Sequence, residues 1–331
     1  MMDPVMLPIL AGDVGGTKTF LRLLVGPDVL LDRRYDCAAY GDITHMIRDF
    51  LVEAGRVPDV AVLGVAGPVA GNRCYATNLP WVIDGDRLAV DLGIAQVRLI
   101  NDFAAVGWGI RALAPEDFSP LNPAEPDIQG PVAFLGAGTG LGEGFLIPCG
   151  SGEVVVTSEG GHTDLAPRNE KEVGVLRYLL RVHKRVSVER VVSGPGIANL
   201  YHFLVYSGRS PAAEVRQAID LGGDIAAIVA EHARARDCEV CVEAMDLFMA
   251  FYGAEAGNLA LKILPSGGVY LAGGIAAKIL DLMQAGPFMA AFGDKGRLSD
   301  LVRSFPVRVI TNPKVGLLGA ARLARSLASS R

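Results

Sequence analysis

Residues 12–18 read Gly-Asp-Val-Gly-Gly-Thr-Lys, and residues 136–142 read Gly-Ala-Gly-Thr-Gly-Leu-Gly. Each stretch lies between two apolar, strand-like runs, so each predicts a glycine-rich turn that joins two strands. Glycine permits positive φ and lets backbone N–H groups approach an anion, while Thr and Lys add a hydroxyl and a positive charge. A single such turn is more often an ordinary hairpin. Two turns of matching design predict a protein that binds a nucleotide's phosphates from two sides.

The first turn nearly matches the Walker A spacing GxxxxGK[ST], but Thr17 stands where that motif requires glycine. In a Walker A loop the chain after the lysine forms a helix whose N-terminus holds phosphate. Residues 19–25 instead alternate as a strand does. The sequence therefore favours a phosphate-binding hairpin.

Further strand and helix patterns follow each turn. In the first part of the chain, apolar periodicity predicts a helix at 44–55, a buried strand at 60–65 and another strand at 97–100. Residues 113–131 contain five prolines and few periodic apolar positions, which indicates a linker. The order strand, glycine turn, strand then begins again at 132–147, so the sequence predicts an internal structural duplication.

The second half is rich in predicted helix, with apolar residues at helical spacing over 170–183 and 211–264. Residues 268–272 indicate a strand that ends at Gly273-Gly274 and leads into a helix. Adenosine or phosphate can lie against bare backbone at such a place. A terminal helix predicted from Gly316 has small residues on one side, which indicates close packing against another element.

Composition limits the class of protein. With 331 residues, of which 50% are hydrophobic, the chain can build about two domains. Its net charge of −5 and lack of a dense Lys/Arg run argue against a nucleic-acid partner. No apolar run reaches the roughly 18 residues of a membrane helix, and the first ten residues lack the basic region of a secretory signal. Five scattered cysteines fit a reducing compartment, so we expect a cytoplasmic protein.

Asp102 follows a strand that is expected to be buried, and its neighbours Ile100 and Phe103 would shield it from water. A carboxylate in that position can take a proton from a hydroxyl nucleophile. Alternatively it caps a helix N-terminus, a role that Asp and Asn both favour. Its position alone leaves both roles open, and the surrounding motifs favour the base.

Asp13 lies within the first turn, where a carboxylate beside phosphate needs a cation between them. Mg²⁺ commonly binds through one or two carboxylates together with phosphates and water. Asp is also common in tight turns for its own backbone hydrogen bonding. The phosphate-loop context favours the metal role.

The stretch Glu159-Gly160-Gly161-His162 places a carboxylate and an imidazole on a turn after a strand-like run. Such a pair can bind the vicinal hydroxyls of a polyol, although the spacing also resembles that of metal ligands. Glu189 could instead form a solvated pair with Arg190 or Lys184. Cys238 and Cys241 lie one helical turn apart with no second pair, so we expect buried thiols and no zinc site.

Five motifs occur in order along nearly the whole chain. They are the first turn, Leu99-Ile100-Asn101-Asp102-Phe103-Ala104-Ala105, the second turn, Glu159-Gly160-Gly161-His162 and Leu271-Ala272-Gly273-Gly274-Ile275. This set resembles the bacterial glucokinases of the sugar kinase superfamily. The resemblance implies an α/β fold of the actin-like ATPase (ribonuclease H-like) type, with a cleft between two domains. A smaller α/β domain of residues 1–115 plus 311–331 would include the returning C-terminal helix, and 116–310 would form a larger α+β domain.

The resemblance also implies ATP-dependent phosphorylation of D-glucose to glucose 6-phosphate, the first step of glycolysis, with Asp102 as general base on the 6-hydroxyl. The residues it implies for sugar binding are Asn78, Asn101, Asp102, Glu159, His162 and Glu189. Those it implies for ATP binding are Gly12, Asp13, Gly15, Gly16, Thr17, Lys18, Gly136, Gly138, Thr139, Gly140, Gly273 and Gly274. Mg²⁺ is expected near Asp13, through water, and a homodimer is expected.

One departure concerns zinc. The related repressor-and-kinase sugar kinases follow their Glu-x-Gly-His with a cysteine-rich zinc loop, whereas residues 163–167 here read Thr-Asp-Leu-Ala-Pro. No structural zinc is therefore expected.

Three alternatives remain from the residues: a kinase for another hexose or an amino sugar, a non-catalytic sugar sensor, and an actin-like or chaperone ATPase. Asp13, Asp102 and both turns disfavour the sensor, and the pair Glu159 and His162 disfavours the plain ATPase.

Overall fold

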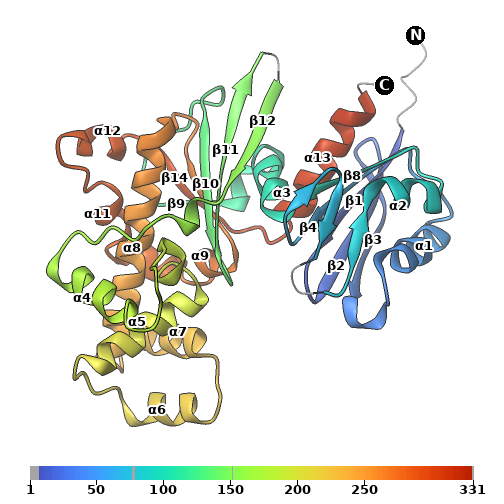
Figure 1. Cartoon of the computed structure of the whole chain (residues 1–331). Coiled ribbons are helices and arrows are strands. Elements are labelled where there is room, and N and C mark those ends of the chain that lie inside the picture. The colour runs from blue at the N-terminus through green and yellow to red at the C-terminus, as the bar shows by residue number, and fades with distance from the viewer. Residues whose placement is uncertain (1–6, 77–78, 151, 330–331) are drawn as a thin grey trace. The chain divides into compact units, whose positions relative to one another are not determined.

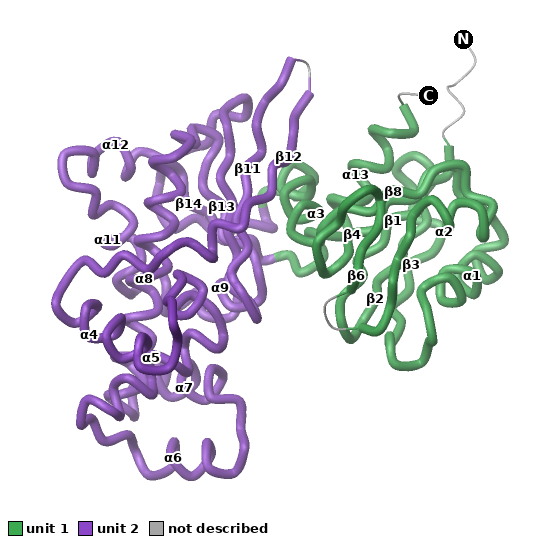
Figure 2. Tube along the Cα trace, viewed as in Figure 1, with its two compact units in different colours: residues 1–115, 312–331 green, residues 116–311 purple. Residues whose placement is uncertain are grey.

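The computed structural model describes residues 7–76, 79–150 and 152–329. The chain divides into two compact units, residues 1–115 with 312–331 and residues 116–311 (Figures 1 and 2). We call them unit 1 and unit 2 and describe each by itself.

Unit 1 is built on a five-stranded sheet in the order β3-β2-β1-β4-β8. Its strands are β1 (Pro8–Val14), β2 (Lys18–Val25), β3 (Asp28–Asp36), β4 (Val60–Val65) and β8 (Gln96–Asn101), and a small second sheet holds β5 (Val69–Ala70), β6 (Arg73–Tyr75) and β7 (Val82–Asp84). β1 pairs antiparallel with β2 and parallel with β4, which in turn pairs parallel with β8. The predicted hairpin is therefore confirmed, and a strand rather than a Walker A helix follows Lys18.

The helices of unit 1 cover both faces of this sheet. They are α1 (Ile43–Ala54), α2 (Gly85–Leu92), α3 (Asp102–Gly109) and α13 (Val315–Ser329). Alternate residues of β1 point to opposite faces: Leu10 joins the core formed with α1 and α2, and Ile9 and Ala11 join the core formed with α13. Both faces of β1 are therefore buried, which explains its nearly continuous apolar sequence.

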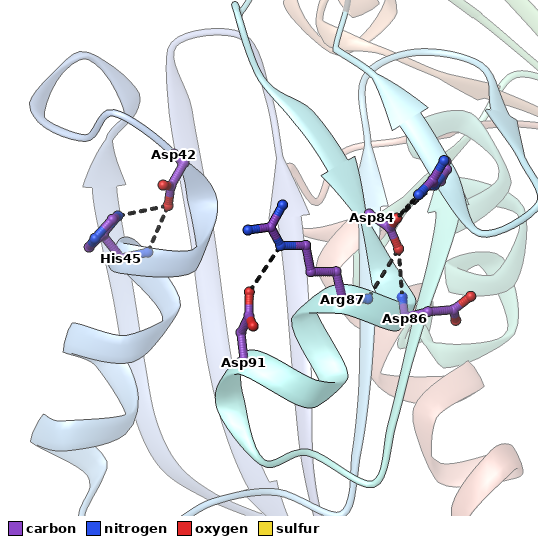
Figure 3. A network of polar contacts seen from close by, with 7 residues as sticks. Asp42, His45, Asp84, Asp86, Arg87 and Asp91 are labelled. Atoms are coloured by element: carbon purple, nitrogen blue, oxygen red, sulfur yellow. Dashed lines mark hydrogen bonds and ion pairs between the residues drawn. The ribbon is translucent and has the colours of Figure 1, made fainter.

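Aspartate side chains cap the N-termini of α1 and α2, and glycines end both helices. Asp42 accepts a hydrogen bond from the His45 N–H at 2.9 Å, and Asp84 accepts from the N–H groups of Asp86 and Arg87 at 3.1 Å each (Figure 3). These carboxylates satisfy N–H groups that have no partner within the helix. Glycines in the left-handed conformation end both helices, with φ of 62° at Gly55 and 67° at Gly93.

The terminal helix α13 packs closely on α3, as its small residues predicted. A Cβ at Gly319 would lie 1.8 Å from the carbonyl oxygen of Ala105, and a Cβ at Gly109 would lie 2.1 Å from that of Val315. Only glycine at these positions allows the two backbones to approach so closely.

Unit 2 contains a six-stranded sheet in the order β12-β11-β10-β13-β14-β9. Its strands are β9 (Phe118–Pro120), β10 (Val132–Ala137), β11 (Leu141–Cys149), β12 (Gly152–Ser158), β13 (Val269–Ala272) and β14 (Val307–Ile310). As in unit 1, three antiparallel strands joined by hairpins are followed by two parallel strands. The predicted internal duplication is thus present in the topology of the two sheets.

The rest of unit 2 is mostly helical, as predicted. Its α-helices are α4 (Glu170–Leu179), α5 (Gly194–Tyr206), α6 (Ala213–Asp220), α7 (Ile225–Ala235), α8 (Glu239–Ile263), α9 (Gly274–Lys278), α10 (Leu280–Ala285), α11 (Phe288–Phe292) and α12 (Ser299–Arg303). Buried α8 side chains such as Phe248 and Tyr252 join the core that includes Leu135 of β10. Cys238 and Cys241 are buried free thiols in this core, as expected. None of the described helices is both long and apolar enough to cross a membrane.

The interpretation of residues 113–131 as a linker is wrong in part. Within this segment β9 pairs antiparallel with β14 at the edge of the sheet. Asn122 donates from its side chain to the Phe305 carbonyl at 2.8 Å and accepts from the Val307 N–H at 3.0 Å. A three-residue strand is too short to show alternation, and Pro120 is tolerated because the strand lies at an edge.

Candidate active site

The first glycine turn connects β1 and β2 through Gly15, Gly16 and Thr17. The Gly15 N–H donates to the Lys18 carbonyl at 3.0 Å, and the side chains of Thr17 and Lys18 are exposed. Gly12 lies one step earlier, inside β1, where a Cβ would come within 2.5 Å of the Leu63 side chain. Its small size is therefore needed for packing against β4, whereas Gly15 to Lys18 offer the exposed polar groups of the turn.

Asp13 lies at the end of β1, beside Gly64 of the parallel strand β4. Its carboxylate faces the start of α13, because a Cβ on Gly316 would lie 3.6 Å from its nearer oxygen. Burial, together with the negative charge of Asp102, raises the pKa of Asp13 to about 6. Two carboxylates that repel one another in a partly buried site form an oxygen donor set that suits a hard divalent cation.

Asp102 is the first residue of α3, directly after β8. The helix cap is Asn101, whose side-chain oxygen accepts from the N–H groups of Phe103 and Ala104 at 2.9 and 3.3 Å. Asp102 itself accepts from the Phe103 N–H at 2.9 Å. Burial raises the pKa of Asp102, opposed by these local hydrogen bonds. The capping role that was open for Asp102 therefore belongs mainly to its neighbour.

Sequence reasoning gave no site role to Gly64 or Gly316, yet Gly64 lies beside Asp102 and Gly316 lies beside Asp13. A Cβ on Gly64 would lie 2.9 Å from the Ala105 side chain and 3.8 Å from the Asp102 Cα, so its absence lets α3 approach β4. A glycine inside the buried run 60–65 was the available signal, because glycine in a strand often marks a close approach.

The second glycine turn connects β10 and β11 through Gly138, Thr139 and Gly140. The Gly138 N–H donates to the Gly140 carbonyl, and the Gly138 carbonyl accepts from Gly194 at the start of α5, each at 2.8 Å. A Cβ on Gly138 would meet nothing within 4 Å, so this side of the turn is open. Gly136 lies buried within β10, one residue from the strand end.

Glu189 lies in a 3₁₀ turn, η5 (Val188–Arg190), and contacts both the second glycine turn and His162. Its carboxylate accepts from the Leu141 N–H at 2.9 Å, and its other oxygen lies 3.9 Å from His162 Nδ1. A Cβ on Gly140 would lie 2.5 Å from this carboxylate. The alternative of a solvated pair with Arg190 or Lys184 is wrong, because the hairpin backbone is a closer partner.

The segment with Glu159 and His162 includes the 3₁₀ turn η4 (Gly160–His162). His162 Nε2 lies 4.0 Å from the Glu159 carboxylate, and both side chains are largely exposed. Glu159, His162 and Glu189 therefore gather at one place in unit 2, although 26 residues separate the last two in sequence. Hydroxyl groups of a ligand can bind to these carboxylates and the imidazole.

Gly273 and Gly274 connect β13 to α9, beside the end of β10. Gly273 has φ of 84°, and a Cβ there would lie 2.6 Å from the Ala137 carbonyl oxygen. Only glycine fits this conformation at this distance. A Cβ on Gly274 would meet nothing within 4 Å, so its backbone is open to a ligand.

The structure thus gathers the predicted residues into two groups. Unit 1 holds Asp13, the first turn, Asn101 and Asp102, and unit 2 holds the second turn, Glu159, His162, Glu189 and the pair Gly273-Gly274. Asn78 lies outside the described residues. In the part of the chain that the structure describes, no group of three or more His, Cys, Asp or Glu side chains forms a metal cluster.

Comparison with known proteins identifies the family. The family model described as Glucokinase matches residues 10–327. The chain belongs to the glucokinase family. It is 44% identical to the glucokinase of Nostoc punctiforme, with 97% of this chain and 100% of that protein covered, and 46% identical to that of Synechocystis sp., with 94% and 96% covered. The resemblance drawn from the five motifs is confirmed, and the protein is a kinase.

Solved structures give the same result for the fold. The crystal structure of a glucokinase from an Antarctic psychrotroph superposes with a TM-score of 0.86 at 29% identity, covering 96% of this chain and 99% of that one. The predicted fold class, the two-domain actin-like ATPase fold, is therefore confirmed, and each unit contains one large sheet packed against helices.

Proposed function

We propose that the protein transfers the γ-phosphoryl group of ATP to the 6-hydroxyl of D-glucose, with Asp102 as general base. The observation that carries this assignment is the place of Asp102: a partly buried carboxylate at the start of α3, next to an asparagine that supplies the helix cap. Burial raises its pKa, which makes the carboxylate a better proton acceptor. As the glucose oxygen bonds to phosphorus, its proton passes to Asp102, the bond to the bridging oxygen breaks, and ADP leaves.

The residues of unit 2 supply orientation in this proposal. Glu159, His162 and Glu189 bind the remaining sugar hydroxyls together with Asn101, and Asn78 is assigned to the same role from the family motif alone. Phosphoryl transfer depends mainly on positioning and charge stabilisation, and these contacts supply the affinity that holds the sugar in place. Glu189 also connects the proposed sugar site to the second turn, because its carboxylate accepts a hydrogen bond from the Leu141 N–H.

ATP is proposed to bind through backbone N–H groups of both turns, with adenosine near Gly273 and Gly274 and with Thr17, Lys18 and Thr139 adding side-chain contacts. Asp13 would hold Mg²⁺ through water, since its carboxylate is buried and lies near the negative charge of Asp102, and both raise its pKa. When bound, the ion would neutralise phosphate charge.

The larger organisation follows from the same proposal. We assign the two compact units to the two domains of the fold. We further propose a cytoplasmic location, because the five thiols are free, and a homodimer, which the family resemblance implies.

The decisive experiment measures ADP release from magnesium ATP with glucose, mannose, fructose, galactose and N-acetylglucosamine supplied separately, and with no sugar. Release mainly with glucose is expected. Release mainly with another hexose would change the assigned substrate, and equal release without sugar would replace the kinase proposal with an ATPase.

A further inference from the structure

Glu143 is a fully buried acidic residue that the proposed reaction does not use. It lies on β11 between two glycines and is 0% exposed. Its neighbours across the sheet are Leu135 of β10 and Ser158 of β12. Because side chains alternate along a strand, Glu143 shares the core-facing side of β11 with Leu141.

Neither carboxylate oxygen of Glu143 has a hydrogen-bond partner among the described residues. Burying an unpartnered charge is costly, so such a group remains neutral unless the pH is raised. The nearby charges increase this cost, because Glu255 of α8 repels a carboxylate while Lys262 compensates only weakly. Burial and Glu255 raise the pKa of Glu143 to about 7.

The other groups around Glu143 do not neutralise it. Glu255 is itself held by Asn258, at 3.0 Å, and lies 3.8 Å from Lys262. Tyr252, also on α8, is buried, and the charge of Glu143 contributes to raising its pKa. Glu159 and His162 lie on the neighbouring segment 159–162. His162 makes ion-pair contacts with Glu159 and with Glu189, not with Glu143.

The Glu143 side chain packs against the segment Glu159–His162, which is proposed to bind the sugar. A Cβ on Gly160 would come within 1.9 Å of Glu143 Oε2, so the carboxyl group packs against the Gly160 backbone. Gly160 in turn fixes the segment: its N–H donates to Ser158 Oγ at 3.0 Å, and its carbonyl accepts from the Thr163 N–H at 2.9 Å. Movement of the Glu143 carboxyl group would therefore displace the turn that carries Glu159 and His162.

We propose that Glu143 is a positioning residue for hexose binding, whose neutral carboxyl group seats Gly160 and whose ionisation displaces the segment Glu159–His162. This inference rests on the proposed sugar role of that segment. An ionised Glu143 must gain water or a cation, and the nearest backbone it can displace is that of Gly160. Because Glu143 acts through Gly160 on side chains that are proposed to bind the sugar, the effect falls on the KM for glucose and leaves kcat largely unchanged.

The test is the KM for glucose between about pH 6 and about pH 9, with kcat recorded separately. In the wild type we expect KM to rise about tenfold, which corresponds to one unit of difference in the Glu143 pKa between free and sugar-bound protein. Glu143→Gln keeps the shape and stays neutral, so its KM is expected to remain low and flat. Glu159, His162 and Glu189 are unchanged in both proteins, so the comparison isolates the effect of Glu143.

A matched variant changes only the neighbour. Glu255→Gln removes the repelling charge, which lowers the pKa of Glu143, so the rise in KM is expected at lower pH. An equal rise in wild type and Glu143→Gln would overturn the proposal, and so would a wild-type KM that does not change with pH.

A measurement on the wild type alone guards against misfolded variants. Above neutral pH, glucose binding without ATP should take up protons, which calorimetry in buffers of different ionisation enthalpy detects. Binding without proton uptake would refute the role of Glu143 while leaving the kinase proposal intact. Absence of both glucose binding and glucose-dependent ADP release would instead refute the proposed function.

Discussion

At the scale of single residues, the two acidic side chains of the candidate site in unit 1 differ in their surroundings. Burial raises the pKa of both, but at Asp102 the hydrogen bond from the Phe103 N–H opposes the rise, whereas at Asp13 the charge of Asp102 adds to it. Neighbouring carboxylates that titrate differently can take different roles. We therefore assign proton transfer to Asp102 and cation binding to Asp13.

Asp102→Asn is expected to bind glucose normally and to lower kcat by roughly 100-fold to 10,000-fold, the usual contribution of a general base. The amide can still accept from the Phe103 N–H but cannot take the proton. Calorimetry of glucose binding and steady-state turnover measure the two effects. A kcat near that of the wild type would exclude Asp102 as the base.

The Mg²⁺ requirement should depend on pH through Asp13. A carboxylate must be ionised to bind the cation, and the pKa of Asp13 is raised to about 6. The half-saturating Mg²⁺ concentration is therefore expected to increase about tenfold for each pH unit below 6 and to level off above it. Asp13→Asn should need more Mg²⁺ than the wild type above about pH 6, with the difference shrinking at lower pH, and a wild-type requirement that is constant between about pH 5 and pH 8 would contradict this assignment.

Glu143 should also affect stability. Its pKa is raised from the ordinary value of 4.5 to about 7, so the folded protein binds more protons than the unfolded chain between these values. Stability contributed by the neutral group is present below about pH 4.5 and is lost as pH rises to about 7, by on the order of 3 kcal/mol. Urea unfolding of wild type and Glu143→Gln across this pH range should show the additional decrease in unfolding free energy only in the wild type. Unfolding free energies that change in parallel with pH in the two proteins would contradict this prediction.

At the scale of elements, the hairpins, the buried strands and the terminal helix were predictable. Their signals are local: glycine turns, uninterrupted apolar runs and small residues at helical spacing. β9 was not predictable because it has three residues and depends on pairing with β14, almost two hundred positions away. Glu143 gave no local signal either, since only the fold shows that an acidic residue of β11 is buried beneath Gly160.

Of the candidate site, the positions of Asp102 and both turns could be read from the sequence. The contact between Glu189 and Leu141 could not, because it joins a 3₁₀ turn to a hairpin 48 residues earlier. The division of roles between Asn101 and Asp102 likewise needed the geometry of the α3 cap.

The contact between α13 and α3 predicts an unusual substitution effect. Gly→Ala inside a helix normally stabilises by about 1 kcal/mol. Gly319→Ala should instead destabilise by about 2 kcal/mol or more, because the new Cβ would lie 1.8 Å from the Ala105 carbonyl oxygen. Gly41→Ala, where the new Cβ would meet nothing within 4 Å, serves as the control and should stay within about 0.5 kcal/mol of the wild type. Equal unfolding free energies for the two variants would show that the helices can separate at no cost.

At the scale of the whole molecule, the proposed groups for phosphoryl transfer are divided between two compact units. If the units close over glucose, water is excluded from the phosphoryl group. We expect glucose to reduce the radius of gyration measured by small-angle X-ray scattering, and to do so equally in Asp102→Asn, which retains sugar binding. An unchanged radius in both proteins would argue against closure.

The return of α13 to unit 1 has a consequence for how the protein is made. Until residues 315–329 have been synthesised, the sheet face formed by Ile9, Ala11, Val60 and Val62 lacks its cover. Unit 2 is contiguous in sequence, so all of its residues are made before those of α13. Unit 1, although its first strands are made earlier, cannot bury this sheet face until α13 has been made, so the nascent chain carries an exposed apolar surface for most of its synthesis.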